Sequence, residues 1–209
     1  MTRILLVRHG QIQLNNPMRF WGQTDLELTE TGVRQINALK ARLDIEDIDH
    51  VFVSDLKRTR RSAEILTGDQ DIPTEICPDI RELNFGSAEG LSYQEICQQY
   101  PELAGALMNW KVMPKFPGGE TMDAFESRVK TFHDKLIDIA GNQTVLVVAH
   151  SGSLRMLICH LLGLSITSWR DFQLDLASLS VVNYFANSGR VMLGLFNDTC
   201  HLEDISIED

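Results

Sequence analysis

The sequence lacks several features that would assign it to a familiar class of protein. Its four cysteines lie far apart and form no CxxC pair, which argues against a structural zinc site or a redox dithiol. No apolar run approaches the roughly 20 residues that a membrane-spanning helix needs. Neither a Gly-rich Walker loop nor an HExxH pattern is present. We therefore expect no metal, no other cofactor and no membrane partner.

The amino-terminal segment also lacks the pattern of a signal peptide. Its short apolar stretch is interrupted by Arg8 and His9, and no small-residue cleavage site follows. A domain of this size does not need disulfide bonds, so reduced thiols are the expectation. These features predict a cytoplasmic protein.

Positive charge is scarce, with 19 Lys and Arg against 29 Asp and Glu, and the formal net charge is −10. Such a charge opposes nonspecific binding to nucleic acid or to an anionic membrane. We therefore expect no nucleic-acid partner. If the protein binds an anion, it must gather its arginines at one point. The oligomeric state, a homodimer included, is left open.

What is present is typical of a globular protein. Hydrophobic residues make up 44% and charged residues 23% of the 209 positions, which are enough to bury a substantial core. Residues 1–209 show no repeat and no polar linker, so we predict a single domain. Within it, residues 84–120 are predicted to be a helical insertion over one end of the sheet. Residues 198–209 are predicted to be a loose acidic tail.

Short apolar runs alternate with amphipathic stretches along most of the chain. We expect strands at 3–8, 50–54 and 144–149, and helices at 29–43, 56–67, 123–140 and 154–164. This alternation indicates βαβ units, and hence a three-layer α/β sandwich in which helices flank a mainly parallel central sheet. Segments 179–186 and 190–196 are separated by Asn187-Ser188-Gly189 and predict a terminal hairpin, with one or both strands antiparallel at the sheet edge.

The three predicted parallel strands are each followed by residues that suit phosphate chemistry. Since the carboxyl ends of parallel strands share one rim, where ligands bind, these residues are expected to surround one crevice. They comprise two arginines, two histidines and the start of a helix, namely Arg8, His9, Arg58, His150 and Ser151.

Each of these groups has a use in phosphoryl transfer. A planar guanidinium grips phosphate oxygens with paired hydrogen bonds and keeps its charge at neutral pH. A neutral imidazole attacks phosphorus and forms a labile covalent intermediate, which makes His9 the candidate nucleophile. His150 can donate a hydrogen bond to the transferring oxygens. Ser151 and Gly152 open a helix, so their backbone N–H groups are expected to face an anion.

Taken singly, each residue has a simpler structural explanation. A lone histidine at a strand end is more often structural, and Arg58 beside Arg60 and Arg61 is typical of a solvated helix face. The convergence of His9, Arg58 and His150 on one rim favours the functional interpretation. A serine nucleophile is less favoured, because the AHSGS segment lacks the GxSxG arrangement and helix capping explains both of its serines.

With these residues in view, the sequence resembles the histidine phosphatase superfamily, the phosphoglycerate-mutase-like enzymes. The RHG triplet of that family stands at 8–10. Further similar segments follow in the family's order, namely GQTDLELTETG at 22–32, SDLKRTRRSA at 54–63, RELNFGSAEG at 81–90, PGGET at 117–121 and AHSGSLR at 149–155. The resemblance implies a phosphoglycerate-mutase-like fold.

The resemblance also implies roles for individual residues. His9 becomes the phosphohistidine, while Arg8, Arg58 and His150 form the phosphate pocket. Asn15 matches an asparagine that contacts the phosphate. Glu82 matches the residue that protonates the leaving oxygen and later activates water, a role that nothing else distinguishes among the 29 acidic residues.

The function predicted is that of a metal-independent phosphomonoesterase acting on a small phosphorylated metabolite. The chain is most similar to the cobalamin-pathway α-ribazole phosphatases and their broad-specificity relatives. Aromatic residues of the insertion offer a mouth for an ester with a flat apolar body, such as α-ribazole 5′-phosphate; they are Tyr93, Tyr100, Trp110 and Phe116. A phosphoglycerate mutase is the alternative, and a non-catalytic phosphate-binding regulatory module is the weaker one.

Overall fold

A mixed β-sheet forms the centre of the molecule. The structure, a computed structural model, describes the chain except residues 14–17, 44–45, 110–111, 140, 204 and 206–209. The sheet has six strands in the order β3-β2-β4-β1-β5-β6. Their bounds are β1 Thr2–Arg8, β2 His50–Val53, β3 Thr74–Ile76, β4 Thr144–Ala149, β5 Leu179–Phe185 and β6 Arg190–Asp198.

Strands β1 to β4 run parallel to their neighbours among themselves, whereas β5 and β6 are antiparallel. The prediction of a mainly parallel sheet with a terminal hairpin at its edge is therefore confirmed. The short edge strand β3 was not predicted, because its polar residues Thr74 and Glu75 give no apolar run.

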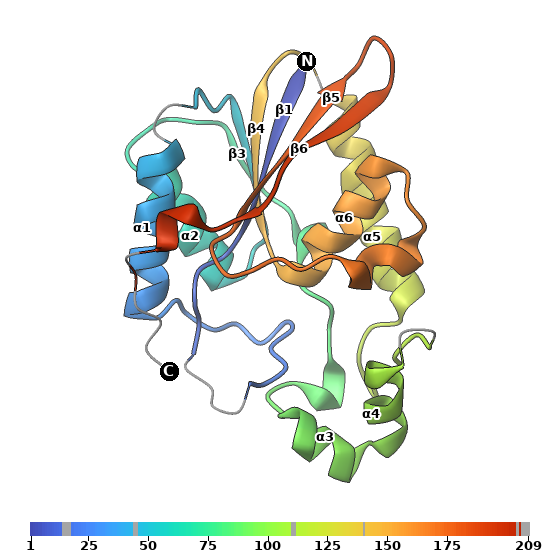
Figure 1. Cartoon of the computed structure of the whole chain (residues 1–209). Helices are drawn as coiled ribbons and strands as arrows, with labels where there is room; N and C mark the ends of the chain where they lie inside the picture. Colours follow the sequence, from blue (N-terminus) through green and yellow to red (C-terminus); the bar gives the residue numbers. More distant parts are fainter. Residues whose placement is uncertain (14–17, 44–45, 110–111, 140, 204, 206–209) are drawn as a thin grey trace.

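Helices cover both faces of the sheet (Figure 1). α1 (Glu30–Leu43) and α2 (Lys57–Thr67) lie on one face, and α5 (Met122–Asp138) and α6 (Ser151–Leu162) lie on the other. α3 (Tyr93–Gln99) and α4 (Pro101–Met108) fall within segment 84–120 and lie beyond the carboxyl ends of the parallel strands. Four short 3-10 helices complete the described elements, η1 Pro78–Ile80, η2 Gly86–Ala88, η3 Ile166–Asp171 and η4 Cys200–Leu202. Among the described residues, no helix combines the length and apolar character needed to cross a membrane.

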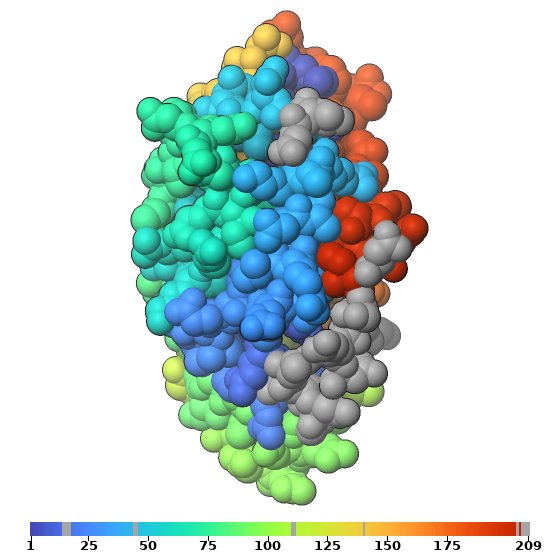
Figure 2. Space-filling model, turned by 90° about the vertical axis from the view of Figure 1, so that its left-hand side faces the viewer, coloured from blue at the N-terminus to red at the C-terminus, as the bar shows by residue number. Residues whose placement is uncertain are grey.

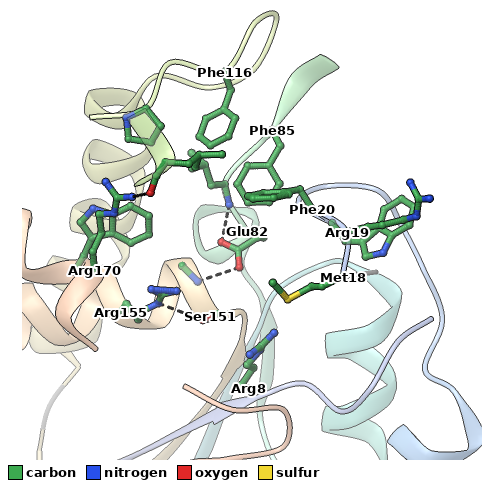
Figure 3. A pocket seen from close by; sticks show the side chains of 16 residues that line it. Arg8, Met18, Arg19, Phe20, Glu82, Phe85, Phe116, Ser151, Arg155 and Arg170 are labelled. Carbon is green, nitrogen blue, oxygen red and sulfur yellow. Dashed lines mark hydrogen bonds between the residues drawn. The ribbon is translucent and has the colours of Figure 1, made fainter. Parts of the chain in front are cut away.

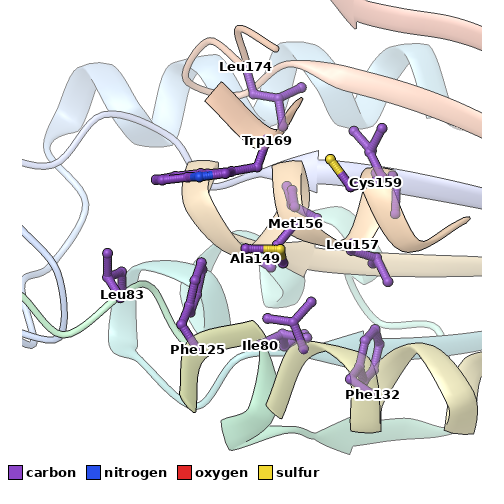
Figure 4. Packing of buried hydrophobic residues seen from close by; sticks show 14 of the residues in the cluster. Ile80, Leu83, Phe125, Phe132, Ala149, Met156, Leu157, Cys159, Trp169 and Leu174 are labelled. Atoms are coloured by element: carbon purple, nitrogen blue, oxygen red, sulfur yellow. The ribbon is translucent and has the colours of Figure 1, made fainter. Parts of the chain in front are cut away.

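The strands read as continuous apolar runs because both of their faces are buried. In β1, Leu5 and Val7 belong to the cluster that packs against α1 and α2, and Ile4 and Leu6 belong to the cluster on the side of α5 and α6. Figure 4 shows the second cluster, in which Phe125 and Phe132 of α5 face residues of α6 and β4. This two-sided burial holds the carboxyl ends of the strands rigidly at one rim.

The carboxyl-terminal residues are not a loose tail where the structure describes them. β6 runs to Asp198, and η4 follows it against α1, as the red and blue atoms side by side in Figure 2 show. Leu202 packs against the cluster of α1 and α2. The carboxylate of Asp198 forms an ion pair with Arg42 on α1. The prediction of a loose segment from residue 198 is therefore wrong for residues 198–202, since Asp198 and Leu202 hold this segment to α1 and its neighbours.

The end of β1 lies so close to the start of α1 that side chains are excluded there. A Cβ atom on Gly32 would lie 2.1 Å from the carbonyl oxygen of Gln11, and one on Gly10 would lie 2.5 Å from the carbonyl oxygen of Gly32. Thr29 caps the helix as predicted, because its Oγ1 accepts a hydrogen bond of 3.0 Å from the Gly32 N–H. This contact places the residues that follow β1.

Replacing Gly32 with alanine should therefore destabilise the fold, because the new methyl group meets backbone that cannot move freely. We expect a loss of about 1–3 kcal/mol in the free energy of unfolding, measured by urea denaturation. Gly105→Ala is the matched control. Gly105 lies in α4 with nothing within 4 Å of a new Cβ, so this change should stabilise the helix by up to about 1 kcal/mol. Equal stability of Gly32→Ala and wild type would contradict the close contact.

Candidate active site

The structure brings together the residues that follow three parallel strands. His9 follows β1, His150 follows β4, and Arg58 lies in the first turn of α2 after β2. The rings of His9 and His150 are 5.1 Å apart between centroids and meet edge to face. All three residues are buried, with His150 and Arg58 fully inaccessible.

The ring of His9 has a defined tautomer. Its Nδ1 lies 2.8 Å from the carbonyl oxygen of Gly10. Since a carbonyl can only accept, Nδ1 carries the proton and Nε2 keeps its lone pair. Burial, together with the positive charges of Arg58 and Arg8, holds the pKa of His9 well below its ordinary value. His9 is therefore a neutral imidazole with a free Nε2, which is the nucleophilic form.

His150 has the opposite tautomer. The Nε–H of Arg58 donates to His150 Nδ1 over 3.2 Å, so the proton of the ring lies on Nε2, which donates to Ser54 Oγ over 2.9 Å. Burial and the charge of Arg58 hold the pKa of His150 well below its ordinary value. The Nε2–H group is the donor expected for the transferring oxygens, and in this structure Ser54 accepts it.

Arg58 is a fixed buried charge. Besides its bond to His150, its Nη1 donates to the carbonyl oxygen of Thr24 over 2.8 Å and its Nη2 to that of Gly22 over 2.5 Å. Burial lowers its pKa, and the carboxylate of Glu82 opposes this shift. The guanidinium thus brings positive charge beside both histidines, and its Nε, Nη1 and Nη2 each already donate a hydrogen bond to the protein.

Arg8 holds a buried donor that the described residues leave without a partner. Its Nη1 donates to the carbonyl oxygen of Leu174 over 2.6 Å, but its Nε makes no hydrogen bond to any described residue. Burial lowers the pKa of Arg8 to about 10, which leaves it charged at neutral pH. An unsatisfied buried N–H is costly unless an acceptor arrives, so Arg8 is suited to an anion.

Glu82 is buried, and its carboxylate occupies the start of α6. Oε2 accepts a hydrogen bond of 3.0 Å from the Gly152 N–H, and Oε1 accepts one of 2.9 Å from the Leu83 N–H. A Cβ atom on residue 152 would lie 2.2 Å from Glu82 Oε1, so this approach requires glycine. In this structure the Gly152 N–H therefore faces the protein's own carboxylate, and the expectation that it faces the anion of a substrate stays a prediction.

A cavity of about 410 Å³ opens beside Glu82 (Figure 3). Arg8, Glu82 and Ser151 of the predicted site line it. Its apolar wall includes aromatic side chains from four segments, namely Phe20, Trp21, Phe85, Phe116 and Trp169. The cavity is therefore lined by both charged and aromatic side chains.

The aromatic wall differs from the predicted one. Phe116 lines the cavity as expected. Tyr93 is exposed on α3, and Tyr100 packs against the core. Trp110 lies outside the described residues, and so does the predicted phosphate ligand Asn15.

Arg155 is a cavity residue that the sequence pattern does not single out. Its Nε donates to Ser151 Oγ over 3.2 Å, and its guanidinium lies 5.3 Å from the ring centroid of Trp169. The spacing of four from Ser151 places both on one face of α6, which is the signal that could have found it. In the described part of the chain, no three His, Cys, Asp or Glu side chains are grouped so as to hold a metal ion.

Comparisons with known proteins agree on one family. The family model described as the histidine phosphatase superfamily (branch 1) matches residues 4–198. Phosphoserine phosphatase 1 of Hydrogenobacter thermophilus is 32% identical over 211 residues, which cover 100% of this chain and 98% of that protein. A protein of Erwinia tasmaniensis named "Probable phosphoglycerate mutase GpmB" is 32% identical over 213 residues, with 100% and 99% covered. The crystal structure of the α-ribazole phosphatase of Shigella flexneri has a TM-score of 0.85 and 29% identity, with 99% and 100% covered.

The two buried neutral histidines make stability depend on pH. Because their folded-state pKa values lie below the ordinary 6.5, the unfolded state binds more protons once the pH falls below 6.5. Stability is then lost on acidification down to the folded-state pKa. Each histidine contributes about 1.4 kcal/mol per pH unit to the slope of the free energy of unfolding against pH.

Urea denaturation of His9→Asn between pH 6.5 and about pH 5 should show a slope of the free energy of unfolding that is shallower than wild type by about that amount. Identical slopes would show that His9 is not held neutral.

Proposed function

Given that the chain belongs to the histidine phosphatase superfamily and is a phosphoric monoester hydrolase, we propose that it acts through a phosphohistidine at His9. We further propose α-ribazole 5′-phosphate, an ester of the cobalamin pathway, as its substrate. The observation that carries the mechanism is the neutral His9 with an unprotonated Nε2, beside the Nε–H of Arg8, which has no hydrogen-bond partner among the described residues.

The first half-reaction phosphorylates the enzyme. The lone pair of His9 Nε2 forms a bond to phosphorus while the bond from phosphorus to the ester oxygen breaks. When Glu82 is in its acid form, its carboxyl proton passes to the leaving oxygen, so an alcohol departs rather than an alkoxide. Arg8 and Arg58 supply the positive charge that balances the transferring phosphoryl group.

The second half-reaction restores the enzyme. Glu82, now a carboxylate, takes a proton from water, and the oxygen of that water attacks phosphorus. The N–P bond breaks and its electron pair returns to His9 Nε2. Inorganic phosphate leaves, and Glu82 is again the acid for the next cycle. A mutase would instead return the phosphoryl group to the organic molecule.

The cavity supports the choice of substrate. Its aromatic side chains suit the flat ring system of a nucleoside-like ester, and the similarity to the α-ribazole phosphatase of Shigella flexneri supports the same substrate.

Phosphoserine is a second candidate substrate, favoured by Arg155. Arg155 lines the cavity and forms no ion pair within the described residues, so a substrate carboxylate would find a cation there. The relative named phosphoserine phosphatase 1 supports this second candidate.

Replacing His9 with alanine should lower kcat by about 10⁴-fold or more while the protein stays folded, as expected for the loss of a nucleophile. Wild type quenched during turnover of a radiolabelled ester should carry phosphate that is labile in acid and stable in base. His133→Ala is the matched control, because His133 lies on α5 away from the cavity, and it should still be labelled. A phosphoenzyme of normal yield in His9→Ala would rule out the mechanism.

The substrate is tested by comparing kcat/KM for α-ribazole 5′-phosphate, phosphoserine and 3-phosphoglycerate. We expect the first to be highest by at least about tenfold, the effect of an aromatic contact or two, with free phosphate as the product. The Arg155→Gln variant should lower the rate on phosphoserine more than on α-ribazole 5′-phosphate. A preference for phosphoserine would replace the proposed substrate. Isomerised phosphoglycerate without free phosphate would make the enzyme a mutase.

A further inference from the structure

A guanidinium outside the cavity holds the backbone that carries Glu82. Arg128 lies on α5 and does not line the cavity. Its Nη1 donates to the carbonyl oxygens of Asp79 over 2.8 Å and Arg81 over 2.7 Å, and its Nη2 donates to that of Glu82 over 2.9 Å. Three carbonyl groups of one short segment therefore converge on a single cation.

Glu120 completes the arrangement. The Nε of Arg128 donates to Glu120 Oε1 over 2.7 Å, and Nη2 donates to Oε2 over 2.8 Å. Together with the three carbonyl bonds, these use all five N–H donors of the guanidinium. The two side chains are only 17% and 14% exposed, so solvent screens the pair less than a surface ion pair. The backbone N–H of Asn84 also points to Glu120 Oε2, at 3.4 Å.

Residues outside the cavity thus hold the backbone of Glu82, while backbone N–H groups at the cavity hold its carboxylate. The side-chain amide of Gln23 adds a further hydrogen bond of 3.1 Å to the Glu82 carbonyl. On the cavity side, the carboxylate has the N–H groups of Gly152 and Leu83. A shift of the backbone would therefore move the carboxyl group relative to the leaving oxygen. Displacement of a catalytic group by about 1 Å can cost about 100-fold in rate.

We propose that Arg128, held by Glu120, is a positioning residue that sets Glu82 for proton transfer to the leaving oxygen. This inference rests on the acid role given to Glu82 in the proposed function. Arg128 itself touches no substrate. Lysine cannot replace it, because an ammonium is a point charge with three donors and cannot serve three carbonyls and both oxygens of a carboxylate at once.

The test compares Arg128→Lys with Glu82→Gln in single-turnover phosphorylation, using an alkyl phosphate and p-nitrophenyl phosphate. An alkyl leaving group needs a proton, whereas p-nitrophenolate leaves without one. If Arg128 acts through Glu82, Arg128→Lys should lose about 10- to 100-fold on the alkyl ester and less than about threefold on the aryl ester. The double variant should lose no more on the alkyl ester than Glu82→Gln alone, because the two changes remove one effect.

Two controls separate positioning from a general effect on the fold. Arg61→Lys changes an arginine whose ion pair with Glu64 is exposed on α2, and it should leave both rates unchanged. Glu120→Gln removes the charge that holds Arg128 but keeps the side-chain shape, and it should show the same dependence on the leaving group as Arg128→Lys. It also serves as the test variant if Arg128→Lys does not fold by circular dichroism.

The possible outcomes are distinct. Equal losses on the two esters in a folded variant, or a full additional loss in the Glu82→Gln background, would overturn the proposal and leave Arg128 as a purely structural residue. If Glu82→Gln itself showed no dependence on the leaving group, the acid role would fail and this inference with it. A normal phosphohistidine at His9 would then show that the nucleophile of the proposed function survives.

Discussion

The burial of the Arg58 guanidinium is the constraint on which the arrangement of the site depends. A fully buried cation must have acceptors, and Arg58 finds them in the carbonyls of Gly22 and Thr24 and in Nδ1 of His150. These bonds fix the tautomer of His150, and the charge itself helps to keep both histidines neutral. The neutral state of His9 therefore depends on its own burial and, next to that, on where this arginine is held.

Carboxylates outside the cavity hold the segments that surround this charge. Glu89 accepts hydrogen bonds from the backbone N–H groups of Gly22, Gln23 and Thr24, the loop whose carbonyls receive Arg58. Glu120 holds Arg128, which in turn fixes the backbone of Glu82. The protein has a net charge of −10 and can still present a cationic site. Part of its negative charge lies outside the cavity, where these carboxylates orient backbone groups and Arg128.

Much of the fold could be predicted because its signals are local. Segment 144–149 is apolar on both faces and forms β4, and Thr29 caps α1 where the sequence places it. The elements that were not predicted depend on distant partners. The strand β3 forms because β2 offers it a free edge, and residues 198–202 are ordered because Arg42 and the α1 surface contact them. The local composition of these two segments does not indicate the partner that either of them packs against.

The sequence by itself determined that His9, Arg58 and His150 share one rim, since each follows a recognisable parallel strand and the geometry of such a sheet does the rest. It also determined the family, through segments in a fixed order. Only the tertiary structure decided that the Glu82 carboxylate binds the first turn of α6 and that Arg155 lines the cavity. It also decided that Phe20, Phe85 and Trp169 line the cavity, rather than Tyr93 of α3 and Tyr100 at the end of that helix. These contacts join segments far apart in the chain, and packing alone sets which of their side chains meet.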